Sequence, residues 1–128
     1  MKCNKEKWNE IQKPSEIDVE AVDGDIIEVI DNIIFLCQRT NNYNNICCLS
    51  LSNSPNCSGA IRAMFKFCIV LYEKYGIEFV RVEGNLRRYR FLERLFSQEE
   101  VIKDLTVQNR NVYYCNIKKA NKRLKELS

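Results

Sequence analysis

The chain has 128 residues, of which 45% are hydrophobic and 29% are charged, and its formal net charge is +3. These proportions are close to those of an average globular protein, so they exclude wholesale disorder, and the length predicts a single domain over residues 1–128. The mild positive charge permits an anionic ligand, whereas a dedicated nucleic-acid-binding domain is usually far more basic.

Seven cysteines and no histidine limit the available chemistry. Without histidine, Ser-His and Cys-His mechanisms are excluded, and because no Cys-x-x-Cys pair occurs we expect no metal site. No segment resembles a signal peptide or a membrane span, so the sequence predicts a cytoplasmic protein without membrane contact. Free thiols are expected at the four cysteines that lie in apolar patterns: Cys37, Cys47, Cys48 and Cys68.

The first third of the chain predicts a short arm followed by antiparallel strands. Residues 1–16 are mostly polar, and a helix or ordered arm there would pack through Trp8 and Ile11. Three apolar runs of strand type follow, at residues 17–22, 25–30 and 33–39. Asp23-Gly24 separates the first two runs and is a strong hairpin signal, while Asp31-Asn32 separates the last two and is a weaker one. We therefore expect an antiparallel meander.

The middle of the chain predicts a strand, a long helix, a second strand and a second helix. Residues 46–51 form a buried-strand run, and turn-formers end it. From Ser58 to Tyr75 apolar residues recur at spacings of three and four, which indicates a helix, and Gly76 is a natural stop. Residues 77–82 alternate as a strand does, and residues 86–96 have helical spacing again. Two strands joined by a helix in this way run parallel if they share a sheet.

The last part of the chain predicts a closing hairpin and a tail. Residues 101–107 and 112–117 read as strands that are joined by a polar turn. Residues 118–128 are basic and helix-prone. We expect this tail to fray, with Leu124 and Leu127 docking only weakly.

The start of the long helix is the first candidate for a binding site. In a strand–helix–strand unit, the loop after the first strand and the helix N-terminus lie at one end of the sheet, where N–H groups and the helix dipole attract anions. A phosphate-bearing ligand is therefore expected at residues 56–61. The alternative is that Ser58 only caps the helix.

The order of these elements resembles that of the GNAT acyltransferase superfamily over residues 17–117. The resemblance implies an α/β (α+β) fold: a mixed sheet with an antiparallel N-terminal meander, a central βαβ unit whose strands splay at their C-terminal ends, and a closing C-terminal hairpin. The segment Val82-Glu83-Gly84-Asn85, followed by Phe91-Leu92-Glu93-Arg94-Leu95-Phe96, is similar to a family motif. Asn85 takes the Asn position of that motif and Phe96 takes its final Phe.

The resemblance implies acetyl-coenzyme A as the cofactor and an amine as the acyl acceptor. The cofactor-binding residues that it implies are Asn56, Ser58, Gly59, Ala60, Ile61 and Asn85. For catalysis, Glu28 or Glu83 is the candidate base, directly or through water, and Tyr89 is the phenol nearest to the position of the family's general acid. The alternative for each carboxylate is an exposed place at a strand end.

The chain departs from the family pattern in two places. Its loop holds one glycine where the pattern Q/R-x-x-G-x-G/A has two small positions, and Leu92 stands where the family has its Tyr. These departures leave open a catalytically inactive domain, such as a phage accessory factor, that binds a protein or nucleic acid through Arg87, Arg90 and Arg94. A solvated arginine face is the ordinary alternative. A thiol enzyme that uses Cys57 or the Cys47-Cys48 pair is a third class.

Overall fold

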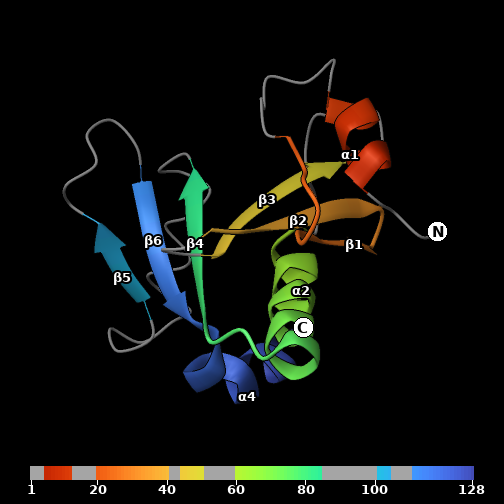
Figure 1. Ribbon diagram of the computed structural model, residues 1–128. Coiled ribbons are helices and arrows are strands. Elements are labelled where there is room, and N and C mark those ends of the chain that lie inside the picture. The colour runs from red at the N-terminus through yellow and green to blue at the C-terminus, as the bar shows by residue number, and fades with distance from the viewer. Residues whose placement is uncertain (1–4, 13–19, 41–43, 51–59, 85–100, 105–110) are drawn as a thin grey trace.

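The computed structural model of the chain describes residues 5–12, 20–40, 44–50, 60–84, 101–104 and 111–128. In these residues six strands form one mixed sheet in the order β1-β2-β3-β4-β6-β5, flanked by three helices (Figure 1). The strands are β1 (Ile26–Ile30), β2 (Ile33–Arg39), β3 (Asn44–Ser50), β4 (Phe79–Gly84), β5 (Val101–Asp104) and β6 (Asn111–Asn116). The helices are α1 (Lys5–Gln12), α2 (Ala60–Tyr75) and α4 (Ile117–Leu127). The chain is thus a mixed α+β protein.

The predicted antiparallel pairing of residues 25–30 with residues 33–39 is confirmed by β1 and β2, and β3 adds a further antiparallel strand. Ile30 pairs with Ile33 across a two-residue turn, and the register continues from Ile26 opposite Cys37. Both turn residues have positive φ, 50° at Asp31 and 63° at Asn32. Asp and Asn tolerate this left-handed backbone, whose twist suits a tight hairpin. The weaker of the two turn signals therefore marks the tight hairpin.

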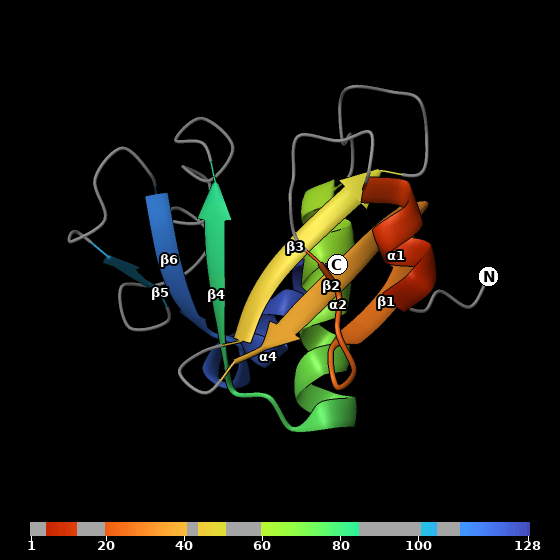
Figure 2. The same ribbon diagram turned by 45° about the horizontal axis from the view of Figure 1, so that its top comes forward.

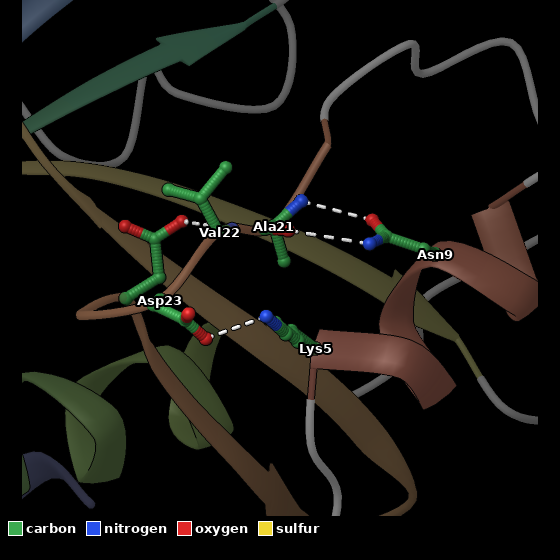
Figure 3. A network of polar contacts seen from close by, with 6 residues as sticks. Lys5, Asn9, Ala21, Val22 and Asp23 are labelled. Atoms are coloured by element: carbon green, nitrogen blue, oxygen red, sulfur yellow. Dashed lines mark hydrogen bonds and ion pairs between the residues drawn. The ribbon is translucent and has the colours of Figure 1, made fainter.

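The other predicted hairpin is wrong in its described part. A turn forms at Asp23-Gly24, with φ of 96° at Gly24, but residues 20–22 before it are not a strand. Instead, the amide of Asn9 in α1 satisfies the backbone of Ala21: Oδ1 accepts from the Ala21 N–H at 2.9 Å and Nδ2 donates to its carbonyl at 3.2 Å (Figure 3). Backbone groups bonded to a side chain are not available to a strand ladder. Residues 17–19 lie outside the described part.

The predicted parallel pairing of the two central strands is confirmed. β3 and β4 pair in parallel at only two positions, Asn45 with Arg81 and Ile46 with Val82, and α2 makes the connection between them. Beyond these positions the two strands diverge toward their C-terminal ends (Figure 2). On the far side, β4 pairs antiparallel with β6, and β6 with β5, as the predicted closing hairpin requires. β5 ends at Asp104, and residues 105–107 of the predicted strand lie outside the described part.

The two faces of the sheet carry separate hydrophobic clusters. On one face α2 and α4 bury the larger cluster, in which the rings of Phe35 and Phe67 stack with centroids 5.0 Å apart. On the other face α1 covers the meander, and Trp8 is fully buried there against Ile34 and Leu36. The predicted N-terminal helix is therefore confirmed, with Trp8 as its anchor. The side chain of Ile11 lies outside the described part.

The C-terminal end of the long helix α2 agrees with the glycine stop signal in the sequence. Gly76 adopts a φ of 71°, which a glycine reaches without strain. Its N–H donates to the Tyr72 carbonyl and the Ile77 N–H donates to the Leu71 carbonyl, both at 3.0 Å, so the last turn is capped. The helix begins at Ala60, and the two residues before it, like the predicted second helix at 86–96, are outside the described part.

The prediction of a fraying tail is wrong. Residues 117–127 form α4, which packs against α2 and buries Ile117, Ala120 and Leu124. The side chain of Asn116 caps its first turn by accepting from the Lys119 N–H at 3.0 Å. Spacings of three and four place the buried residues on one face, so the helix docks by the same rule that docks α2.

We predict that truncation of Leu124 destabilises the protein far more than truncation of Leu127. Leu124 is 1% exposed and Leu127 is 37% exposed on the same helix. Leu124→Ala should lower the free energy of unfolding in urea by about 2–4 kcal/mol, because it removes buried apolar surface and leaves a cavity, whereas Leu127→Ala should cost less than about 1 kcal/mol. Equal and small losses for both variants would show that α4 is not docked.

Candidate functional site

The candidate site is the region between the diverging C-terminal ends of β3 and β4, at the end of the sheet where α2 begins (Figure 2). The beginning of α2 and the C-terminal ends of both strands lie at the same end of the sheet, the upper end in Figure 2. The backbone N–H groups of Ala60 and Ile61 are in the first turn, where a helix supplies no internal acceptors and its dipole is positive. Arg62 in the same turn is exposed and adds a positive charge. This end of the sheet therefore favours an anionic group.

The structure describes part of the predicted site. Ala60 and Ile61 lie at the start of α2, and Glu83 lies in β4 directly after Val82, the last residue of β4 that pairs with β3. Glu83 is thus close in the chain to the point where the strands part. The remaining predicted site and partner residues lie outside the described part: Asn56, Ser58, Gly59, Asn85, Arg87, Tyr89, Arg90 and Arg94.

Glu28, the other candidate base, lies far from the start of α2. Its carboxylate pairs with Lys74 Nζ at 3.8 Å, and Lys74 is in the last turn of α2. Lys74 comes fourteen residues after Ala60, which corresponds to about 21 Å along a helix. The structure therefore does not bring Glu28 together with the helix N-terminus, and its catalytic assignment has no support from the geometry.

A chain of polar side chains crosses the junction of β3 and β4 on the face opposite α2. Arg81 Nη1 donates to Asn45 Oδ1 at 2.9 Å, and Asn45 Nδ2 donates to Gln38 Oε1 at 3.2 Å. The neighbouring residues Ile46 and Val82 belong to the cluster under α2, so Asn45 and Arg81 point to the other face. The three side chains are partly buried and link β2, β3 and β4. They hold the register of the short parallel pairing.

The sequence reasoning did not identify this chain of side chains. Its signal was Arg81 between the apolar residues Val80 and Val82, together with Asn45 at the edge of an apolar run. Such a residue in a sheet needs a polar partner. Which residue becomes that partner depends on the register of β3 with β4, because Asn45 and Arg81 are 36 residues apart in the chain.

Three buried thiols are poor nucleophiles. Burial raises the pKa of Cys37 and that of Cys115 to about 12, and it also raises the pKa of Cys68. Cys37, Cys47 and Cys68 are free thiols as predicted, and Cys115 is a fourth, whereas the side chain of Cys48 lies outside the described part. The sulfur of half-buried Cys47 accepts a hydrogen bond from Asn45 Nδ2 at 3.4 Å. Since a thiolate is the reactive form, the three buried thiols do not support a thiol enzyme.

The described residues bear on the predictions about metal and membrane contact. Among them, no group of three or more Cys, Asp or Glu side chains is arranged to hold a metal ion. None of the described helices combines the length and the apolar character needed to cross a membrane.

No family model, curated protein or solved structure matches the chain.

We predict that the buried thiols make the protein less stable as the pH rises above 9. In the unfolded chain a thiol titrates near its ordinary pKa of 9.0, whereas Cys37 keeps its proton in the folded chain until its pKa of about 12. Between these values the unfolded state binds fewer protons, so stability falls with rising pH, by up to about 1.4 kcal/mol per pH unit for each such thiol.

Urea unfolding between pH 8 and pH 10 checks this prediction. Cys37→Ala should make the free energy of unfolding fall less steeply with rising pH, since one titrating group is gone. Ile46→Val also alters a buried position but removes no titrating group, so it should keep the wild-type slope. An unchanged slope in Cys37→Ala would contradict the assignment of Cys37 as a buried thiol.

Proposed function

We propose that the chain is a divergent, GNAT-like N-acyltransferase that takes its acyl group from acetyl-coenzyme A. The observation that carries this proposal is the short parallel pairing of β3 with β4, which ends at Ile46 and Val82, so that the strands diverge toward the end of the sheet where α2 begins (Figure 2). Among the described residues the two strands form no further pairs, so backbone groups on the facing edges are available to a ligand. The resemblance places the acyl donor in such an opening.

The first turn of α2 supplies the phosphate-binding part of the proposed site. The N–H groups of Ala60 and Ile61 need acceptors, and the dipole of a 16-residue helix favours negative charge at its N-terminus. Exposed Arg62 adds a cation close by. These features fit the pyrophosphate of coenzyme A, which carries negative charge between the adenosine and the pantetheine arm.

The reaction needs positioning more than it needs a reactive side chain. Acetyl-coenzyme A supplies an activated thioester, and an acceptor amine attacks its carbonyl directly. A backbone N–H on the open edge of β3 would stabilise the charge that develops on the carbonyl oxygen. Because no histidine is present, a carboxylate is the natural acceptor of the amine proton.

Glu83 is the carboxylate that suits this role, because it follows the last residue of β4 paired with β3. Glu28 is less suited, because its partner Lys74 is at the far end of α2. Tyr89 remains the proposed source of the proton for the departing thiolate. The alternative function, a non-catalytic domain that binds a protein or nucleic acid through Arg87, Arg90 and Arg94, applies if acetyl-coenzyme A does not bind.

We predict that the first N–H group of α2 contributes to acetyl-coenzyme A binding. Ala60→Pro removes this N–H, and proline is tolerated at the first helical position, so the fold should survive. In isothermal titration the variant should bind about tenfold more weakly, the loss expected for one hydrogen bond to a charged group.

Ala60→Gly is the matched control, since it changes the side chain at the same position but keeps the N–H. It should bind acetyl-coenzyme A as the wild type does. The acyltransferase proposal fails if the wild type gives neither heat nor a thermal shift with millimolar acetyl-coenzyme A. Equal affinities for the proline and glycine variants would instead remove α2 from the binding site.

A further inference from the structure

A second candidate site lies at the other end of the sheet, where α2 ends and β4 begins. A cavity of about 380 Å³ opens there, near the connection between α2 and β4 at the lower end of Figure 2. The residues that give it chemical character are Arg39, Asn44, Tyr75, Glu78, Phe79 and Tyr114. Its volume falls within the range of pockets that hold small ligands. Since the site for acetyl-coenzyme A is proposed at the opposite end of α2, the two sites are separate.

The aromatic residues of this cavity are unusually exposed. Phe79 is 56% exposed and Tyr75 is 38% exposed, and they are two of the four large hydrophobic side chains that are exposed among the described residues. Tyr114, a third ring, also lines the cavity. Exposed aromatic rings that gather at one concave place are characteristic of ligand-binding surfaces, because a flat ligand can cover them.

The backbone around these rings is held in place. Asn44 Nδ2 donates to the Phe79 carbonyl at 3.1 Å, which ties the start of β3 to the start of β4. The carbonyl of Glu78 accepts from the N–H groups of Ile117 and Lys118, at 2.9 Å and 3.3 Å. The cavity is therefore largely formed before any ligand binds, which lowers the entropic cost of binding.

The charges at the cavity favour an anion. The carboxylate of Glu78 is balanced by Lys118, whose Nζ lies 3.0 Å away. Arg39 is exposed, and its backbone N–H is bonded to Asp25 Oδ1, but no ion pair of its guanidinium occurs within the described residues. A guanidinium presents several donors in one plane and binds a carboxylate or phosphate well. Of the described residues that line the cavity, Arg39 is the one with a positive charge.

We propose that this cavity binds a small planar aromatic anion. The ring of the ligand lies against Tyr75 and Phe79, and its anionic group contacts the guanidinium of Arg39. The aromatic contacts exclude water and set the orientation, and the charge selects an anion over its neutral analogue.

Amide chemical-shift titration of the full chain tests this proposal. The probe is indole-3-carboxylate, and the matched neutral compound is indole-3-carboxamide. The carboxylate should shift the amides of residues 39, 44, 75–80 and 114, and the carboxamide should bind roughly fivefold more weakly, as expected for one exposed charge contact. Arg39→Gln should lower the affinity for the carboxylate by the same factor and leave that for the carboxamide unchanged.

Three further variants separate ring contact from general surface effects. Phe79→Ala should weaken both compounds roughly fivefold, since it removes an aromatic contact. Val22→Ala and Lys122→Gln alter exposed residues elsewhere and should change nothing. All four positions are exposed, so each variant should keep the wild-type spectrum outside the site.

Three results would overturn the proposal. The first is that indole-3-carboxylate causes no localised chemical shifts at a concentration of about 10 mM. The second is equal affinity for the carboxylate and the carboxamide. The third is a shift of the same amides on dilution of the protein alone, which would assign Tyr75 and Phe79 to self-association.

Discussion

The parallel pairing between β3 and β4 is the connection on which the rest of the structure depends. It joins the β1–β2–β3 meander to the β4–β6–β5 half of the sheet, and within the described residues it does so through two residue pairs. The side-chain bonds from Arg81 to Asn45 and from Asn45 to Gln38 reinforce it, each with a net contribution of about 0.5–1.5 kcal/mol. Further support comes from the bond between Asn44 and the Phe79 carbonyl and from α2 and α4, which lie across the same face of the sheet (Figure 1). A junction of this kind is short enough to open toward one end while the packed helices keep the two halves together.

This opening gives the two ends of the sheet different chemistry. At the end toward which the strands diverge, α2 presents its first turn, whose N–H groups have no acceptors within the helix and where the dipole is positive. At the other end α2 stops at Gly76, and the chain turns directly into β4, which leaves Tyr75 and Phe79 exposed beside Arg39. The helix between them keeps the two places about 20 Å apart. A ligand at one end therefore does not obstruct the other.

Much of the fold could be predicted because local signals and burial agree. The hairpin at Asp31-Asn32, the helix stop at Gly76 and the crossover between two apolar strands each follow from short-range chemistry. The strand before Asp23 was wrongly predicted because Asn9, twelve residues before Ala21, takes the backbone bonds that a ladder would need. The docking of α4 was missed because its basic residues were given more weight than the spacing of Ile117, Ala120 and Leu124. The site was less predictable, since the separation of Glu28 from the start of α2 and the contact of Arg81 with Asn45 depend on strand direction and register.

Amide chemical-shift mapping with acetyl-coenzyme A tests the central claim most directly, because it reports where the molecule binds as well as whether it binds. The account predicts that shifts concentrate in the first turn of α2, at residues 60–63, and along the diverging ends of β3 and β4, at residues 47–50 and 82–84. The amides around Lys74 and Glu28 should not move. Shifts gathered instead at Tyr75 and Phe79, or no shifts with millimolar acetyl-coenzyme A, would contradict the claim that the junction of β3 and β4 opens to hold an acyl donor.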